Sequence, residues 1–321
     1  MSVLEIGGIH IEPGERRRLE IPVARLPTNT WLSLPVEVLQ GKQGGMRLWL
    51  SAAVHGDELN GVEIIRRVLT QVQPDQLQGT LIAVPIVNVF GFIEQSRYLP
   101  DRRDLNRHFP GSPRGSLAAR LAHLFMTEIV SRCTHGVDIH TGSNHRANLP
   151  HVRADLQNEE TRRCAAAFGA PVIVDARTRD GSLREAATER GIHCLLYEAG
   201  EASRFNDDAI AVGVRGVLRL MRALRMRKRQ PTRPHGEVLA AGETTWVRAR
   251  RGGIVRMEVE LGERVSYKQL LATVSGALGE DTSNLHAPSG GLVIGVTRNP
   301  LVNRGDGVVH LTKGPLEPVH V

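Results

Sequence analysis

VHGDELNG, residues 54–61, joins an apolar stretch at 48–54 to a helical pattern at 60–69. The apolar stretch is typical of a buried strand, so His55 lies at a strand's carboxyl end, where open α/β sheets place their ligands. A histidine and an acidic residue three positions apart are common by chance in a chain with 13 His and 34 acidic residues, so the motif alone is weak. His55 and Glu58 therefore indicate either an ordinary turn or half of a metal site.

Strands and helices alternate over most of the 321-residue chain. The expected strands cover residues 34–39, 48–54, 80–87, 137–140, 172–175 and 192–197. The expected helices cover 60–69, 116–132, a segment from Ser182 to about Gly191, and 207–228. Capping boxes are predicted at Asn60/Glu63 and Ser182/Glu185, and Ser116 is a predicted N-cap. This alternation predicts an α/β sheet covered by helices on both faces.

The character of the chain changes after Pro231 and Pro234. Residues 236–321 are rich in Gly and Val and contain a weak repeat, because ARRGGIV at 249–255 matches APSGGLV at 287–293 and Val265 matches Val302. Two β units of this length predict a small, pseudo-symmetric barrel. We therefore expect a catalytic α/β domain at residues 1–235 and a β-barrel domain at residues 236–321.

Charge and composition limit the partners. The chain carries 41 basic and 34 acidic residues, and much of the excess lies in the basic segment 222–233. This segment is predicted to be a helix end that runs into a linker; the alternative is a patch for nucleic acid or another anionic surface. Aromatic residues make up 4% of the chain, which disfavours stacking on single-stranded nucleic acid. No nucleic-acid partner is expected.

The sequence predicts a cytoplasmic location and no membrane partner. Three scattered cysteines without a CxxC motif suit a reducing compartment. The first residues show no basic region followed by an apolar one, as a signal peptide would. The longest apolar run, LIAVPIVNVFGFI, is too short to span a bilayer.

Acidic and histidine side chains end two further expected strands. VDIHTG ends one strand in His140, and LLYEAG ends another in Glu198. Because carboxyl ends of neighbouring strands meet at one edge of a sheet, two imidazoles and two carboxylates should converge. Two imidazoles and one carboxylate are the ligands of a catalytic zinc site with one open position, so we expect one Zn²⁺ per chain. Asp138, two residues before His140 on the same side of its strand, is expected to orient that imidazole.

The remaining polar groups have expected roles around this metal. Glu198 is the predicted general base for a metal-bound water, and later the acid for the leaving amine; Glu201 is the rival base. The loop QSRYLPDRRDLNRHFPG at 95–111 supplies guanidinium groups suited to binding a carboxylate or a developing oxyanion. Arg102 and Arg103 are expected to be solvated.

HGDE, DLNRHFPG, DIHTG and YEAGE, in this order, resemble the succinylglutamate desuccinylase/aspartoacylase family of the zinc carboxypeptidase superfamily. The resemblance covers almost the whole chain. It implies a zinc-carboxypeptidase-like mixed sheet flanked by helices, followed by a small biotinyl/lipoyl-like barrel that narrows access to the site. It also implies zinc bound by His55, Glu58 and His140, with Glu198 as the catalytic carboxylate.

The resemblance further implies hydrolysis of the amide bond in a small N-acyl amino acid or related N-acyl amine. Arg97 matches the residue that polarises the scissile carbonyl, and Asn106 and Arg107 match the pair that holds a substrate carboxylate. The segment SNHRANLPHVRAD is closer to a broad bacterial group that acts on varied N-acyl compounds, including acetylated diaminobutyrate in ectoine breakdown. Arg146 and His151 are candidates to line that pocket.

Two other functions stay open on sequence alone. One is a metallocarboxypeptidase that trims small peptides with the same machinery. The other is a non-catalytic binding protein that acts through the barrel or the basic segment 222–233. A covalently carried cofactor is not expected, because SGALGEDTSN, which joins the two repeats, has no lysine, and Lys268 lies in a predicted turn elsewhere. Homo-oligomers are possible.

Overall fold

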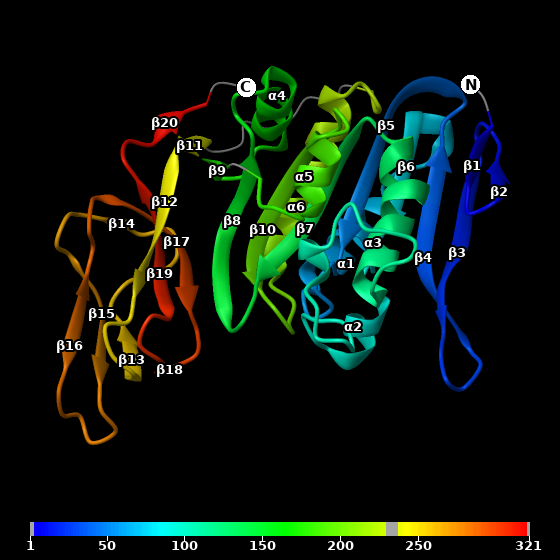
Figure 1. The fold of residues 1–321 in the computed structure, drawn as a ribbon. Helices are drawn as coiled ribbons and strands as arrows, with labels where there is room; N and C mark the ends of the chain where they lie inside the picture. Colours follow the sequence, from blue (N-terminus) through cyan, green and yellow to red (C-terminus); the bar gives the residue numbers. More distant parts are fainter. Residues whose placement is uncertain (1–2, 177, 229–236, 320–321) are drawn as a thin grey trace.

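The computed structural model describes residues 3–176, 178–228 and 237–319. Figure 1 shows one long sheet, with the N-terminal strands at one end, the C-terminal strands at the other and helices in front and behind. The domain boundary predicted near residue 235 lies outside the described residues, as do Arg229 and Arg233 of the basic segment.

The centre of the sheet is parallel. Its neighbouring strands, in order, are β10 (His193–Glu201), β7 (His135–Gly142), β5 (Gln43–Ala52) and β6 (Gln78–Val84). Antiparallel strands flank this centre: β4 (Trp31–Gln40) and β3 (Arg16–Arg25) beside β6, and β8 (Arg146–Ala154) beside β10. The other strands of this part are β9 (Val172–Asp175), which is parallel to β8, and the hairpin β1 (Leu4–Ile6) and β2 (Ile9–Ile11). The sheet is therefore mixed, as expected.

Helices cover both faces of this sheet. One face carries α1 (Asn60–Leu69), α4 (Glu159–Phe168) and α6 (Asp207–Ala223). The opposite face carries α3 (Leu117–Glu128) and α5 (Leu183–Thr188), and α2 (Val89–Glu94) lies near the carboxyl edge. Short 3₁₀ turns occupy Pro74–Gln76, Leu105–Arg107 and Val130–Arg132. Because strand side chains alternate between faces, Leu50 packs in the core under α1 and α6, and its neighbour Trp49 packs in the core under α3 and α5.

The C-terminal residues form an all-β region, and its main hydrophobic core also includes Ala147 of β8. Three strands extend the main sheet beyond β8: β17 (Gly291–Thr297), β19 (Gly307–Lys313) and β12 (Glu243–Arg248). A second sheet contains β13 (Gly253–Met257), β15 (Leu270–Ser275), β16 (Ser283–His286) and β18 (Leu301–Val302). The remaining strands are β11 (Leu239–Ala241), β14 (Arg264–Val265) and β20 (Glu317–Pro318).

The predicted internal repeat is present in this region as a structural repeat. The matching segments begin β13 and β17, and the matching valines lie in β14 and β18. Each long strand pairs with the short strand of the other repeat, since β13 pairs with β18 and β17 pairs with β14. This exchange is what a pseudo-two-fold arrangement of two β units requires.

The predicted capping box of α1 is wrong. Leu59 is the N-cap and has no side-chain cap bond. Asn60 instead donates to the Ala199 carbonyl at 3.1 Å, and Glu63 pairs with arginines of its own helix. At α5 half of the predicted capping box is present: the Ser182 hydroxyl accepts from Glu185 N at 3.2 Å, but the Glu185 carboxylate accepts from Gly181 N at 2.7 Å and not from Ser182 N. At α3 the predicted cap Ser116 is also confirmed.

Three elements were not expected from the sequence, α2, β8 and α4, and three helices are shorter than expected. The helix expected from Ser182 to about Gly191 ends at Thr188. The helix expected over 207–228 ends at Ala223, and the one expected to reach residue 132 ends at Glu128. β8, with the sequence RANLPHVRA, lacks a clear apolar alternation; its Arg153 lines the site described below and its Asn148 bonds to Glu198. None of the described helices is both long and apolar enough to cross a bilayer.

Close packing of Gly136 against Trp49 gives a stability prediction. The two residues are partners across β7 and β5, Trp49 is fully buried, and a Cβ at Gly136 would lie 2.1 Å from the indole ring. We expect Gly136→Ala to lower the free energy of unfolding by about 1–3 kcal/mol, the usual cost of overpacking. Gly44→Ala, in strand β5 with no atom within 4 Å of the added methyl, is the matched control. Equal denaturation midpoints for the two variants would contradict this packing.

Candidate metal centre and active site

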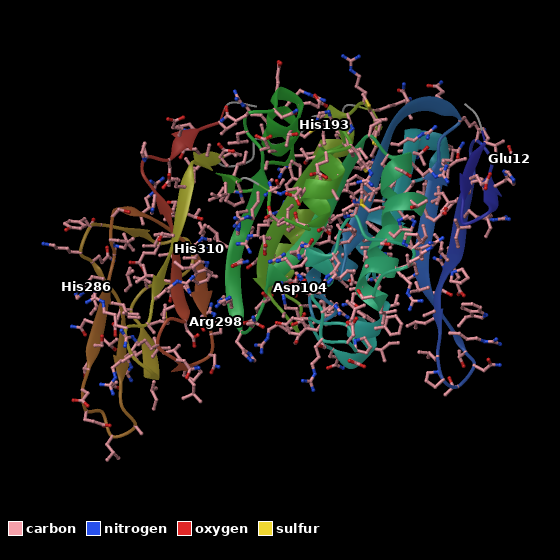
Figure 2. The ribbon with its side chains drawn as sticks, viewed as in Figure 1. Glu12, Asp104, His193, His286, Arg298 and His310 are labelled. Carbon is pink, nitrogen blue, oxygen red and sulfur yellow. The ribbon has the colours of Figure 1, made fainter. Side chains whose placement is uncertain are left out.

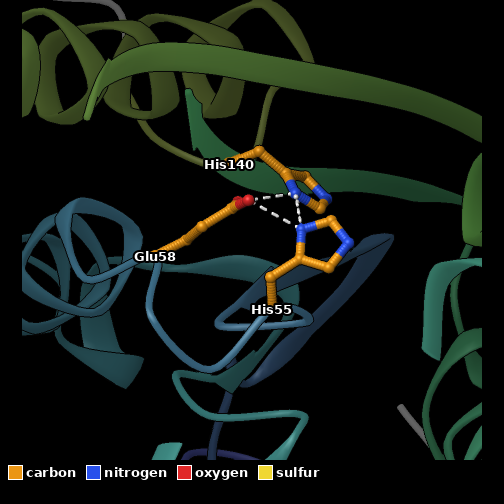
Figure 3. Close-up of side chains that lie close together, drawn as sticks. All are labelled: His55, Glu58 and His140. Carbon is orange, nitrogen blue, oxygen red and sulfur yellow. Dashed lines mark hydrogen bonds and ion pairs between the residues drawn. The ribbon is translucent and has the colours of Figure 1, made fainter. Parts of the chain in front are cut away.

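Three predicted ligands meet at the carboxyl edge of the sheet (Figure 3). Glu58 Oε1 lies 2.7 Å from His55 Nδ1, and Glu58 Oε2 lies 2.8 Å from His140 Nδ1. The two Nδ1 atoms are 3.2 Å apart. All three side chains are buried. The structure thus brings together two segments that are far apart in the sequence.

Local backbone geometry places these ligands. His55 and Glu58 lie in the connection from β5 to α1, and His140 lies in β7, which pairs in parallel with β5. Glu58 Oε2 also accepts a hydrogen bond from Thr141 N at 3.0 Å. Gly56 passes so close to α2 that a Cβ would lie 1.9 Å from the backbone of Gly91. Only glycine fits at position 56 of this connection.

The donor set fits zinc. Two imidazole nitrogens and one carboxylate are typical zinc ligands, and two nitrogens on one tetrahedral zinc lie about 3.3 Å apart. His55 Nδ1 and His140 Nδ1, at 3.2 Å, already have this spacing. The two Nδ1 atoms face each other and contact the same carboxylate. One cation between them would bind the lone pair of each nitrogen and the carboxylate charge. The same ligands also accept other borderline divalent metals.

Asp138 orients one of the imidazoles, as expected from its position. Its Oδ2 lies 2.7 Å from His140 Nε2, so that Nδ1 points to the other ligands. Ser51 Oγ donates to Asp138 Oδ1 at 2.8 Å, and Trp49 Nε1 donates to Ser51 Oγ at 3.2 Å. This buried chain of hydrogen bonds fixes the ring and increases its basicity as a ligand.

Asp104 plays the same part for the other imidazole, and sequence reasoning missed it. Its Oδ1 lies 3.2 Å from His55 Nε2, and its Oδ2 accepts from Arg97 Nη2 at 2.8 Å. Burial disfavours its charge, but His55 and Arg97 together hold the pKa of Asp104 well below its usual range. The available signal was its place in DLNR, two residues before the predicted Asn106.

Glu198 lies in β10, beside His140 across the parallel pair. Its Oε2 accepts from Asn148 Nδ2 of β8 at 2.9 Å. Burial raises the pKa of Glu198, and the His140 charge partly opposes this. Glu201, the rival base, pairs instead with Arg204 at 3.0 Å. A bulge after Glu198 separates the two environments.

A cavity of about 130 Å³ contains the three ligands, Glu198 and the predicted substrate residues. Arg97 Nη1 lies 3.5 Å from Glu58 Oε1. Asn106 is buried, and its Oδ1 accepts from Leu183 N at 2.9 Å, which joins it to α5. Arg107 is exposed and donates to the Asn106 carbonyl at 2.6 Å. The predicted site residues therefore face one cavity, apart from Asp138 behind it.

The prediction that Arg146 and His151 line this pocket is wrong. Arg146 and His151 are not among the described residues that line the cavity. Arg146 lies over the Trp246 ring at 4.8 Å, and His151 Nδ1 bonds to the Leu149 carbonyl at 2.8 Å. The cavity wall that sequence reasoning missed contains other polar side chains, namely Thr141, Ser143, Arg153, Arg179, Ser182 and Arg184. Arg102 and Arg103 are exposed, as expected.

Guanidinium groups dominate the charge of the cavity wall. Arg97, Arg107, Arg153, Arg179 and Arg184 all line it. Burial lowers the pKa of Arg153; the charge of Glu198 partly opposes this, and the like charge of Arg179 adds to it. A buried cation is costly unless an anion pairs with it. The cavity is thus suited to an anionic ligand.

The sequence profile of the succinylglutamate desuccinylase/aspartoacylase catalytic domain matches residues 44–224. A curated relative, the N-alpha-acetyl-L-2,4-diaminobutyric acid deacetylase of Halomonas elongata, is 27% identical over 271 residues, 80% of this chain and 78% of that protein. These matches and the fold define the class of protein, a deacylase family with an α/β catalytic domain. The chain belongs to the succinylglutamate desuccinylase/aspartoacylase family.

Solved structures agree with this assignment. The succinylglutamate desuccinylase/aspartoacylase of Rhodobacter sphaeroides superposes with a TM-score of 0.85 at 25% identity, covering 95% of this chain and 96% of that one. The product-bound ectoine utilization protein EutE of Ruegeria pomeroyi superposes with a TM-score of 0.84 at 24% identity, covering 93% and 94%. The family resemblance seen in the sequence motifs is confirmed.

The contact between Asp104 and His55 gives a prediction on metal binding. Asp104→Asn removes the charge that orients the imidazole, and loss of such a partner usually weakens metal binding by about 10–100-fold. We expect that fall in zinc affinity, measured by competition with a chelator. Asp101→Asn is the matched control in the same loop, because Asp101 only pairs with Arg103 at the surface. Equal affinities for the two variants would show that Asp104 does not support the metal site.

Proposed function

We propose that this protein hydrolyses the amide bond of a small N-acyl amino acid, with one Zn²⁺ held by His55, Glu58 and His140. The observation that carries the proposal is that these three ligands, Glu198 and Arg97 face one cavity. Membership of the family and the named activity of the Halomonas relative support it. When bound, zinc would act as a Lewis acid and lower the pKa of a water molecule.

The chain's own residues would handle the protons and the developing charge. Glu198, whose pKa is raised by burial, takes a proton from the attacking water and later gives it to the leaving nitrogen. Asn148 holds Glu198 Oε2 and thereby fixes the direction of the carboxylate. Arg97, anchored by Asp104, donates to the carbonyl oxygen as its negative charge grows.

Substrate binding would depend on the guanidinium groups. Asn106, whose Oδ1 is held by Leu183 N, and Arg107 are proposed to hold a substrate carboxylate. Arg153 and Arg179 make no hydrogen bond or ion pair to other described residues, although both line the cavity. An anionic acyl group or an acidic amino acid would satisfy them, whereas a cationic diaminobutyrate side chain would not. We therefore favour substrates that carry two or more carboxylates.

We also infer a division of the chain near residue 235, into a catalytic domain at 1–235 and a carrier-like β-barrel domain at 236–321. The main core of the C-terminal region, which takes only Ala147 from the α/β part, and the two exchanged β units support this inference. β17 pairs with β8, which supplies Asn148 and Arg153 to the site. The C-terminal domain would thus support one wall of the cavity through the β17–β8 pairing. The cavity volume of about 130 Å³ favours small substrates over polypeptides.

Replacing Glu198 by Gln tests the proposal. The amide cannot accept the proton, so we expect turnover of N-acetyl and N-succinyl amino acids to fall by about 10²–10⁴-fold. Bound zinc should stay near the wild-type amount, since Glu198 is not one of the three converging ligands. Steady-state kinetics and elemental analysis measure the two quantities on the same samples.

Glu201→Gln is the matched control, because Glu201 pairs with Arg204 and does not line the cavity. It should keep turnover within a few-fold of wild type. Near-wild-type activity in Glu198→Gln, or a collapse in Glu201→Gln alone, would show that the base is misassigned. A wild-type protein that cleaves C-terminal dipeptides but no N-acyl amino acid would instead be a carboxypeptidase.

A further inference from the structure

A second group of metal-binding side chains lies at the opposite edge of the sheet. His135 Nε2 is 3.0 Å from Glu160 Oε1, and Cys164 Sγ is 3.7 Å from the same oxygen. One ligand atom from each of the three residues lies within 4.8 Å of the other two. His135 and Cys164 are buried, and Glu160 is partly exposed. None of these residues takes part in the proposed deacylase chemistry.

Two elements present these donors to each other. Glu160 and Cys164 are four residues apart on α4, so they share one face of that helix. His135 and His193 are partners across the parallel strands β7 and β10, and their rings lie 5.2 Å apart. Figure 2 shows His193 at the end of the sheet opposite Asp104, which binds the imidazole of the catalytic edge. The group is therefore separate from the catalytic site.

Neighbouring polar groups already orient the donors. Thr134 Oγ1 lies 2.9 Å from His135 Nδ1, which leaves Nε2 to face the carboxylate and the thiol. Arg163 Nε donates to Glu160 Oε2 at 2.8 Å, so that Oε1 points toward the histidine and cysteine. Hydrogen bonds of this kind behind each ligand are a usual feature of protein metal sites.

We propose that Cys164, His135 and Glu160 form a second metal site, which takes one thiophilic divalent ion of the zinc class. Thiolate, imidazole and carboxylate together are ligands of such ions, and His193 lies next to His135 as a further imidazole. On binding, the Cys164 thiol loses its proton to solvent and its sulfur bonds to the ion. His135 binds as the neutral tautomer whose Nδ1–H donates to Thr134.

Binding of the ion requires Arg163 to move and would stabilise the fold. Arg163 also contacts Glu160 Oε1, at 2.5 Å, and must move away from that oxygen when the ion binds. Its side chain is 47% exposed, and its Nη1 donates to the Ala223 carbonyl at 3.1 Å, a bond that does not involve Glu160. The bound ion would tie α4 to the amino end of β7. Such a link stabilises the folded state by the free energy of metal binding.

Cobalt titration tests this site without interference from the catalytic one. A sulfur-to-cobalt charge-transfer band in the near ultraviolet requires a thiolate ligand, and the His55–Glu58–His140 site has no sulfur. We expect metal-free wild-type protein to develop this band, saturating at one thiolate-bound Co²⁺ per chain. The band should be lost in Cys164→Ser and kept in Cys133→Ser, which changes another buried free cysteine.

Glu160→Gln keeps the thiol but removes one charged ligand. It should raise the dissociation constant for cobalt by about tenfold or more, equivalent to about 1.4 kcal/mol. This variant also covers the case in which Cys164→Ser does not fold, which circular dichroism would reveal. Absence of the band from folded wild-type protein in excess cobalt, or its survival in Cys164→Ser, would overturn the proposal. A cobalt affinity unchanged in Glu160→Gln would overturn the assigned ligand set.

Discussion

The buried carboxylate of Glu58, shared between the imidazoles of His55 and His140, is the interaction on which the site depends. Burial alone would raise the pKa of Glu58, but the two histidines hold it well below its usual range. A carboxylate is stable in such a place only if positive charge lies beside it. A divalent cation among these three groups would supply that charge and also the Lewis acidity for the proposed hydrolysis.

The fold keeps this arrangement rigid from several sides. β5 and β7 pair in parallel, so the connection after β5 and the end of β7 reach the same edge. Asn60, at the start of α1, donates to the Ala199 carbonyl at 3.1 Å and accepts from Asn206 N at 3.0 Å. These bonds join the helix after the ligand loop to the strand that carries Glu198. The proposed base and the proposed ligands are thus fixed relative to each other by one hydrogen-bonded set.

Much of the site was predictable because its residues end strands. His55, His140 and Glu198 each follow an apolar run, and the rule that carboxyl ends converge was enough to bring them together. Asp104 was missed because it lies in an irregular loop, where no periodicity tells which side chains turn inward. Arg153 was missed because β8, which carries it, was not expected as a strand. Asn60 was predicted as half of a capping box, but its bonds are tertiary and cannot be read from local sequence.

Diffraction at the zinc absorption edge, from crystals grown with zinc, tests the central claim most directly. The account predicts an anomalous peak bonded to His55 Nδ1, His140 Nδ1 and the Glu58 carboxylate. The peak should vanish from crystals of Glu58→Ala while the fold is retained. A wild-type crystal with no peak between these residues, at zinc concentrations that support turnover, would contradict the account.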